Sequence, residues 1–434
     1  MFGTTHPSRL AVALAALLLI APAAGASSVP SGPSAAAPAG LAVLEDAKAG
    51  DLRPLQQAMP GFADPGLAAL ARARLAAARL EDRAARHALA SYWALPGRVP
   101  AADAQAWSIE ADIAFAGGDY ARAARATARW LALLDGDDAA RAGVAQYHGV
   151  AAALADVPAQ TVRSRMPREV ATRRDRAGLL RVPVSVNGTA REAVFDTGAN
   201  LSVLSESAAR ALGVRVLAAD ANVASGSREQ VATRLGVAGR LEVAGIELSN
   251  VVFLVIDDAL LEMPLPGGYR IDAIVGFPVL RAIGRMRLGK DAFLPLPSRE
   301  PGSASPGNLH VVGNDLFVDL AVDGDATALH LDTGAPASQL STRFARSHPG
   351  VLAGLARDER HSASAGGSTS QPVAWWPRVP VSVAGATTVL PRLAVAMEDS
   401  EDVGTHAFGT LGLDVLDAFG GCVLDLDAMA LELE

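Results

Sequence analysis

The chain has 434 residues, of which half are apolar and 19% are charged, and its formal net charge is −8. This composition is typical of a folded globular protein, and the length predicts two to three domains. The negative balance excludes the basic surface that a nucleic-acid partner requires, and the single cysteine, Cys422, excludes an intramolecular disulfide.

The N-terminus predicts export. Arg9 precedes an apolar run from Leu10 to Ile20, and Ala24-Gly25-Ala26 follows as an A-x-A cleavage site. A membrane anchor is the alternative, but a bilayer span needs about 20 apolar residues and this run is shorter. We expect residues 1–26 to be a signal peptide, residues 27–40 to be a flexible Ala-, Pro- and Ser-rich lead-in, and the protein to be periplasmic or secreted from a bacterial cell.

Residues 41–160 predict a helical domain. The segment is rich in Ala, Leu and Arg, and its apolar residues recur three or four positions apart, as in Ile109 and Ile113. Trp107 and Gly118-Asp119-Tyr120 fall at spacings that resemble one unit of a tetratricopeptide repeat (TPR). A packed helical hairpin explains this pattern as well as a peptide-binding array does, so a protein partner for this domain is one of two open interpretations.

Residues 161–178 are expected to form an exposed basic linker. Six arginines lie between Arg163 and Arg176, and Pro167 interrupts them. A solvated connector is the first interpretation. The alternative is a processing site, because exposed basic linkers are readily cut by proteases.

From residue 179 the sequence changes to β-branched alternation interrupted by glycine, which is typical of short antiparallel strands. This part repeats itself without a gap. Asp196-Thr197-Gly198-Ala199 and Asp332-Thr333-Gly334-Ala335 are separated by 332 − 196 = 136 positions. Gly276 and Gly412, which follow Ile274-Val275 and Thr410-Leu411, are separated by the same 412 − 276 = 136 positions.

The repeat predicts two lobes, residues 179–296 and residues 309–434. The stretch from Pro295 to Gly307 contains four prolines and three serines, so residues 297–308 are expected to be a linker. In each lobe a two-residue turn, Asn187-Gly188 or Asp323-Gly324, returns the chain into the strand that ends at the aspartate.

The paired motifs indicate chemistry between the two lobes. An ionised carboxylate that follows Phe195 or Leu331 in a buried strand is costly unless it is hydrogen-bonded or shares a proton with a partner. Glycine after the aspartate allows another backbone to approach, and the threonine hydroxyl can bond across to the opposite loop. Two such sites predict that each aspartate is the partner of the other.

These residues resemble the retropepsin and pepsin superfamily of aspartic peptidases, over residues 179–434. The resemblance implies a multidomain chain in which a helical, TPR-like domain precedes a duplicated, two-lobed antiparallel β acid-protease fold. It implies a catalytic pair, Asp196 and Asp332, that activates water to hydrolyse peptide bonds in an extended peptide or protein substrate, without a cofactor. It maps the residues that brace the active-site loops onto Thr197, Gly198, Ala199, Thr333, Gly334, Ala335, Gly276 and Gly412.

Retropepsins assemble as homodimers, whereas this chain carries both copies, so we expect a monomer. Separate dimerisation of each lobe is the alternative. The histidines and the lone Cys422 show no spacing typical of metal ligands, so no metal is expected.

Two glycine- and serine-rich segments are candidate flaps over a bound peptide, and ordinary surface hairpins are the alternative. Neither contains a tyrosine. The candidate residues are Ser225, Gly226, Ser227, Ala365, Gly366 and Gly367.

Two further interpretations stay open. His330 lies two positions before Asp332 on the same strand face, where it either perturbs the aspartate pair or only packs. Trp375-Trp376 either lines the cleft or packs a strand. The alternative function is a catalytically inactive peptide-binding or scaffold protein that retains the acid-protease fold.

Overall fold

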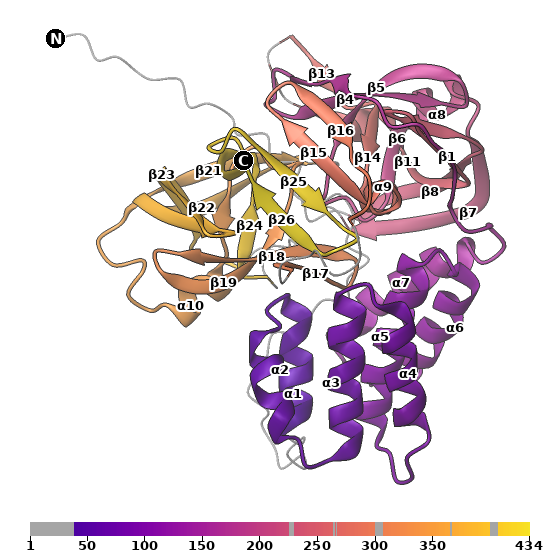
Figure 1. Ribbon diagram of the computed structural model, residues 1–434, viewed down its shortest axis with the longest axis vertical. Helices are drawn as coiled ribbons and strands as arrows, with labels where there is room; N and C mark the ends of the chain where they lie inside the picture. Colours follow the sequence, from indigo (N-terminus) through magenta and orange to yellow (C-terminus); the bar gives the residue numbers. More distant parts are fainter. Residues whose placement is uncertain are drawn as a thin grey trace.

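A computed structural model describes residues 39–224, 230–263, 265, 267–299, 307–364, 367–399 and 407–434. The signal peptide, most of the lead-in and most of the linker between the lobes lie outside these residues. Helices come first and are followed largely by β-sheet, so the expected order of an α part and a β part is confirmed (Figure 1).

The helical region consists of consecutive antiparallel helices joined by short turns. Asp64 and Asp119 begin two of them, because their carboxylates accept hydrogen bonds from the N–H groups of Leu67 and Arg122. The helices are α1 (Ala39–Asp46), α2 (Arg53–Ala58), α3 (Pro65–Ala78), α4 (Asp82–Trp93), α5 (Pro100–Ala116), α6 (Tyr120–Leu131) and α7 (Arg141–Ala153), with short 3₁₀ turns η1 (Ala47–Ala49) and η2 (Met59–Gly61). Ala39 and Gly40, which we expected in the flexible lead-in, already belong to α1.

The first β region is an eleven-stranded sheet with the order β1-β10-β9-β4-β5-β14-β6-β11-β8-β7, in which β3 also pairs with β4. Its strands are β1 (Thr161–Arg165), β3 (Arg173–Arg174), β4 (Leu180–Val186), β5 (Thr189–Phe195), β6 (Ser202–Ser205), β7 (Arg215–Ala224), β8 (Gln230–Ala238), β9 (Leu241–Val243), β10 (Ile246–Ser249), β11 (Val251–Ile256) and β14 (Ala273–Val275). Two helices, α8 (Glu206–Ala211) and α9 (Phe277–Ile283), and a small pair, β12 (Glu262–Met263) and β13 (Tyr269–Arg270), accompany this sheet.

The second β region is an eight-stranded sheet with the order β17-β18-β19-β24-β20-β23-β22-β21. Its strands are β17 (Leu309–Val312), β18 (Asp315–Val322), β19 (Asp325–Leu331), β20 (Gln339–Leu340), β21 (Ala356–Ser364), β22 (Gly367–Val383), β23 (Ala386–Ala396) and β24 (Gly409–Leu411), with helices α10 (Thr342–Ser347) and α11 (Leu413–Leu416).

The two β regions share a pattern around one short central strand. In the first, β14 runs parallel to β5 and antiparallel to β6. In the second, β24 runs parallel to β19 and antiparallel to β20. The central strand therefore separates the strand that ends at the aspartate from the strand that follows the aspartate loop.

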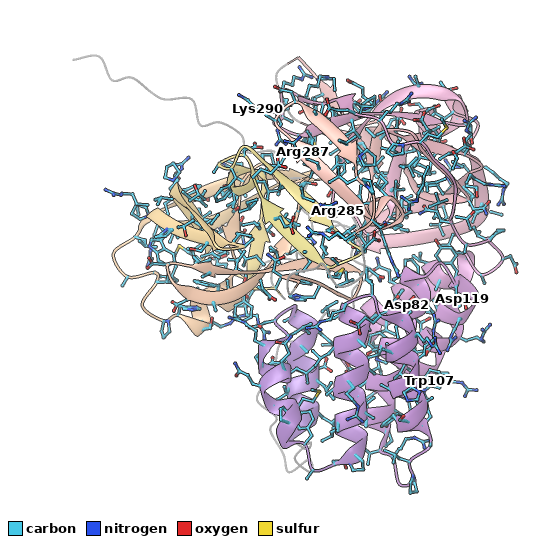
Figure 2. The ribbon with its side chains drawn as sticks, viewed as in Figure 1. Asp82, Trp107, Asp119, Arg285, Arg287 and Lys290 are labelled. Atoms are coloured by element: carbon cyan, nitrogen blue, oxygen red, sulfur yellow. The ribbon has the colours of Figure 1, made fainter. Side chains whose placement is uncertain are left out.

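A third sheet joins the two β regions. Its order is β2 (Val170–Ala171), β16 (Ala292–Pro295), β15 (Arg285–Gly289), β25 (Gly421–Asp425) and β26 (Ala430–Leu433). The antiparallel pair β15 and β25 brings Arg285 opposite Asp425, whose buried carboxylate also lies 2.8 Å from Arg299 Nε. Figure 2 shows Arg285 and Arg287 along β15. One apolar core, which includes Phe195 and Phe293, extends through both regions behind this sheet.

Residues 161–178, which we expected to form an exposed basic linker, contribute the three short strands β1, β2 and β3. The segment is exposed along β1, but β1 pairs with β10, β2 with β16 and β3 with β4. Edge strands with two solvated faces need only backbone hydrogen bonds, so their side chains do not show the apolar alternation from which strands are predicted.

Among the described residues, no helix combines the length and apolar character that a bilayer crossing requires.

Candidate active site

Asp196 and Asp332 come directly after β5 and β19, where each strand meets its short central neighbour. The Asp196 N–H donates to the carbonyl of Val275 at 3.1 Å, and the Asp332 N–H donates to the carbonyl of Leu411 at 3.0 Å. Both aspartates therefore leave buried sheet at a backbone position that the central strand fixes.

The two loops are tied together by their threonines. The Thr197 hydroxyl donates to the Leu331 carbonyl at 2.6 Å and accepts the Thr333 N–H at 3.0 Å. The Thr333 hydroxyl donates to the Phe195 carbonyl at 2.9 Å and accepts the Thr197 N–H at 3.0 Å. These four hydrogen bonds are reciprocal and buried, and each crosses from one β region to the other.

The glycines after the threonines lie against the opposite aspartate. A Cβ atom at Gly198 would lie 2.7 Å from Asp332 Cγ, and one at Gly334 would lie 2.5 Å from Asp196 Oδ2. Any side chain at either position would therefore push the carboxyl of the other loop away, whereas glycine lets the two loops touch. The structure thus brings Asp196 and Asp332 together across the seam.

The carboxyl groups are held by nearby N–H groups. Asp196 Oδ1 accepts from the N–H groups of Gly198 at 2.8 Å and Ala199 at 3.1 Å. Asp332 Oδ1 accepts from the N–H group of Gly334 at 2.7 Å. Oδ1 of each carboxyl is therefore held by the N–H groups of its own loop.

Gly276 and Gly412 fix the rear of the two loops. A Cβ atom at Gly276 would lie 2.6 Å from the Ala199 carbonyl oxygen, and one at Gly412 would lie 2.7 Å from the Ala335 carbonyl oxygen. The same carbonyls accept the N–H groups of Phe277 at 2.8 Å and Leu413 at 2.9 Å. The eight loop residues that the sequence singled out therefore meet in one place.

Two serines contribute to this arrangement that the sequence analysis did not assign to the site. The Gly276 N–H donates to Ser202 Oγ at 3.1 Å, and the Gly412 N–H donates to Ser338 Oγ at 2.9 Å. Their separation, 338 − 202 = 136 positions, is that of the aspartates, and this shared offset could have identified them.

The aspartate pair is removed from solvent, with exposed fractions of 0% for Asp196 and 1% for Asp332. Burial raises the pKa of Asp196 to about 6, against the opposing effect of the hydrogen bonds from Gly198, Asp332 and Ala199. A raised pKa in a buried carboxyl pair is the condition in which one proton is shared between two acids.

Further titratable groups lie near the pair. His330 is buried, its ring centroid lies 5.8 Å from that of Phe317, and burial lowers its pKa to about 4, so it is neutral near pH 7. Val194 occupies the corresponding position before Asp196. Asp315, which the sequence analysis missed, is buried at the start of β18, and burial raises its pKa to about 7 despite a hydrogen bond from Asn200.

The candidate flaps belong to two long hairpins, β7 with β8 and β21 with β22. Ser225, Gly226, Ser227, Ala365 and Gly366 lie outside the described residues, while Gly367 begins β22 opposite Ser364. Trp375 and Trp376 are both on β22, and the Arg392 guanidinium lies 4.1 Å from the centre of the Trp375 ring. Within the described part of the chain, no three His, Cys, Asp or Glu side chains are grouped as metal ligands would be.

Residues 182–279 match the family model described as aspartyl protease. No curated protein matches the chain. Among solved structures, a retropepsin-like aspartic protease from Rickettsia conorii is similar at 18% identity over 32% of this chain and 91% of that chain, with a TM-score of 0.21. At that score the structural likeness carries no argument. The family match covers Asp196 with its loop and Gly276, and it supports a hydrolase of the peptidase class.

Proposed function

We propose that this protein is an aspartic endopeptidase in which Asp196 and Asp332 activate a water molecule against a peptide bond. The observation that carries the proposal is the reciprocal threonine network, which ties together the loops of the two buried aspartates, while the glycine of each loop lies against the carboxyl of the other. A structural ion pair would need a cation, whereas two acids held together require a shared proton.

The chemistry follows from that shared proton. The ionised carboxylate takes a proton from water as the water oxygen bonds to the scissile carbonyl carbon, and the protonated carboxyl donates its proton to the carbonyl oxygen. The tetrahedral product then loses the amine. As the C–N bond breaks, the nitrogen receives a proton from one carboxyl, and a hydroxyl of the diol gives its proton to the other carboxylate, which leaves a carboxylic acid and restores the shared proton. The Oδ1 contacts with Gly198 and Gly334 hold both carboxyls in orientation throughout.

The finer architecture belongs to the same proposal. We infer that the two β regions are duplicated lobes, in support of which β5-β14-β6-β11 and β19-β24-β20-β23 have the same order and directions. An extended peptide would lie between the lobes and pair with the hairpins β7-β8 and β21-β22. The helical region would be TPR-like, in which the turn Gly118-Asp119 between α5 and α6 supports a repeat unit.

We also propose export of the mature chain without residues 1–26, which the apolar run Leu10 to Ile20 supports. The expected result is a mature N-terminus at Ser27, measured by mass spectrometry of protein from the periplasm or medium. Protein that keeps Met1 in the cytoplasm would contradict it.

The central test is hydrolysis of a mixed peptide library between pH 3 and pH 8. Asp196→Asn and Asp332→Asn should each lower the cleavage rate by at least about 10³-fold, because neither single carboxyl can act as both acid and base. Asp137→Asn, at an exposed carboxyl in the helical region, is the matched control and should cleave as wild type does.

Cleavage that survives either substitution would exclude the two-aspartate mechanism. Peptide binding without cleavage by the wild type, and with no dependence on Asp196, would favour the scaffold function instead.

A further inference from the structure

The face of β5 that carries Asp196 is turned toward the helical region. Phe195 points into the core shared by the two β regions, where its ring centroid lies 5.5 Å from that of Phe293. Because side chains alternate along a strand, Val194 lies on the face of Asp196. Val194 is fully buried in a different apolar cluster, one that it shares with Tyr147 and Val150 of α7.

The face of β19 that carries Asp332 is turned the same way. His330, two positions before Asp332, contacts the ring of Phe317 on β18, and Phe317 belongs to the apolar cluster built by α1, α3 and α5. Gly50 of the helical region lies directly on that ring: a Cβ atom there would be 2.2 Å from Phe317 Cε1. The Gly50 carbonyl also contacts the buried His310 ring.

Polar contacts also join the helical region to the two β regions. Asn314, in the turn between β17 and β18, donates to the Tyr147 hydroxyl at 3.4 Å. Arg281 of α9 donates to the Ala116 carbonyl at the end of α5 and lies 3.6 Å from Asp82, which Figure 2 shows at the end of the helical region nearest the β regions. Arg343 of α10 pairs with Asp46 at 3.0 Å.

The helical region therefore contacts both β regions at once (Figure 1). In addition, α7 packs on β7, one strand of the hairpin to which the first candidate flap belongs. One connection, residues 154–160, leads from α7 to β1, so the helical region can turn away without breaking the sheet that β1 joins.

We propose that the helical region is a built-in cover of the active site, which excludes peptides until it moves away from Phe317 and β7. With the cover in place the aspartates are 0% and 1% exposed, and the faces from which they emerge are occupied by apolar packing. Access to the pair then depends on displacement of this chain's own helices. The part of this proposal that concerns peptides rests on the proposed function, whereas the covering of the carboxyls does not.

The test opens the interface with one side chain. Gly50→Val places a branched side chain against Phe317, at a residue with φ +91°. Gly97→Val is the matched control, because Gly97 has φ +67° in the same helical region but no atom within 4 Å of its Cβ position. Both variants carry a similar backbone strain, and only Gly50→Val separates the helices from the second β region.

Two readouts are measured on full-length protein at one pH. The first is labelling of Asp196 and Asp332 by a water-soluble carbodiimide with glycinamide, mapped by mass spectrometry with exposed Asp137 as the internal reference. The second is cleavage of the peptide library. We expect Gly50→Val to raise both by at least about tenfold over wild type and Gly97→Val to leave both unchanged.

The outcomes separate the two proposals. If the aspartates are labelled as fast in wild type as in Gly50→Val, the proposal that the helical region covers them is overturned, whatever the cleavage rates are. Raised labelling in Gly50→Val with no cleavage supports the cover and overturns the proposed peptidase function.

A second variant keeps the test decisive if Gly50→Val does not fold. Arg281→Ala removes the contacts with Ala116 and Asp82, and Arg210→Ala removes an exposed arginine that pairs with Glu206 inside the first β region. Faster labelling in Arg281→Ala than in Arg210→Ala supports the cover, and equal labelling in these two and wild type contradicts it.

Discussion

The hydroxyl groups of Thr197 and Thr333 each form hydrogen bonds with the opposite β region. Each hydroxyl donates to a carbonyl and accepts an N–H group across the seam, in a place that water does not reach. A buried polar group without a hydrogen-bond partner destabilises the fold by more than an average hydrogen bond stabilises it. Any shift of one loop would leave such groups unpaired, so the network holds the two loops in place.

Thr333→Val should lower the free energy of unfolding by about 2–4 kcal/mol, because it leaves the Thr197 N–H and the Phe195 carbonyl buried without partners. Thr327→Val, on the strand β19 that leads into the same loop, is the control. The Thr327 hydroxyl is buried without a hydrogen-bond partner, so its replacement should be neutral or stabilising. Urea unfolding measures the free energy of unfolding of both variants. Equal losses of stability would show that the hydrogen bonds across the seam do not stabilise the fold.

Asp196→Asn should stabilise the chain more at pH 7 than at pH 4. Burial raises the pKa of Asp196 from 3.8 to about 6, so the native state holds this proton where the unfolded state releases it. Between those pH values the stability of the wild type falls as pH rises, whereas an asparagine does not titrate. The gain should grow by up to about 3 kcal/mol across that interval.

Chemical denaturation of both proteins at pH 4, 5, 6 and 7 checks this. A gain that does not change with pH would mean that the carboxyl titrates alike in the folded and unfolded chain.

The short strands β14 and β24 act as spacers between longer strands, and the glycine after each lets the aspartate loop pass behind it. Gly276→Ala should cost more than about 2 kcal/mol of stability and displace the first loop, because its Cβ atom would lie 2.6 Å from the Ala199 carbonyl oxygen. Gly149→Ala is the control: Gly149 is on the exposed side of α7, and no atom lies within 4 Å of its added Cβ. The free energy of unfolding of this variant should rise by up to about 1 kcal/mol. Thermal unfolding distinguishes them, and a harmless Gly276→Ala would show that the loop can shift.

At this scale the sequence predicted the elements that carry local signals. The Asn187-Gly188 and Asp323-Gly324 turns precede β5 and β19 as expected, and both residues of each turn have positive φ. The strand β1 was missed because its pairing with β10 buries no apolar side chain of its own, and its five side chains are exposed. Hydrophobic alternation reports which face is buried, so a strand with no buried face leaves no such pattern.

The third sheet makes the two β regions one body, since β15, which follows the first β region, and β25, which follows the second, pair over five residues. Both aspartates lie on one chain, so a complete site needs no second copy. We therefore expect a single-chain mass in sedimentation velocity at micromolar concentration, with a cleavage rate per chain that does not change on dilution. A two-chain mass whose activity falls on dilution would favour separate pairing of the lobes.

The place of the helical region could not be read from the sequence. Its contacts with the β regions join residues far apart in the chain, as in Gly50 with Phe317 and Tyr147 with Asn314. Each of these residues is also an ordinary member of a helix, turn or strand. A constant offset between repeats shows which segments of the chain resemble each other. It does not show how the helical region, which has no counterpart in the β regions, packs against them.

Val194 and His330 occupy equivalent positions before the two aspartates, and they differ in kind: one is aliphatic, and the other is a ring with nitrogen atoms. A perfectly twofold groove would accept a chain equally well in either polarity. In the proposed peptidase this mismatch would make the two halves of the site unequal, so a bound peptide would have a preferred N-to-C direction, and a sequence and its reversed counterpart would be cut at different rates.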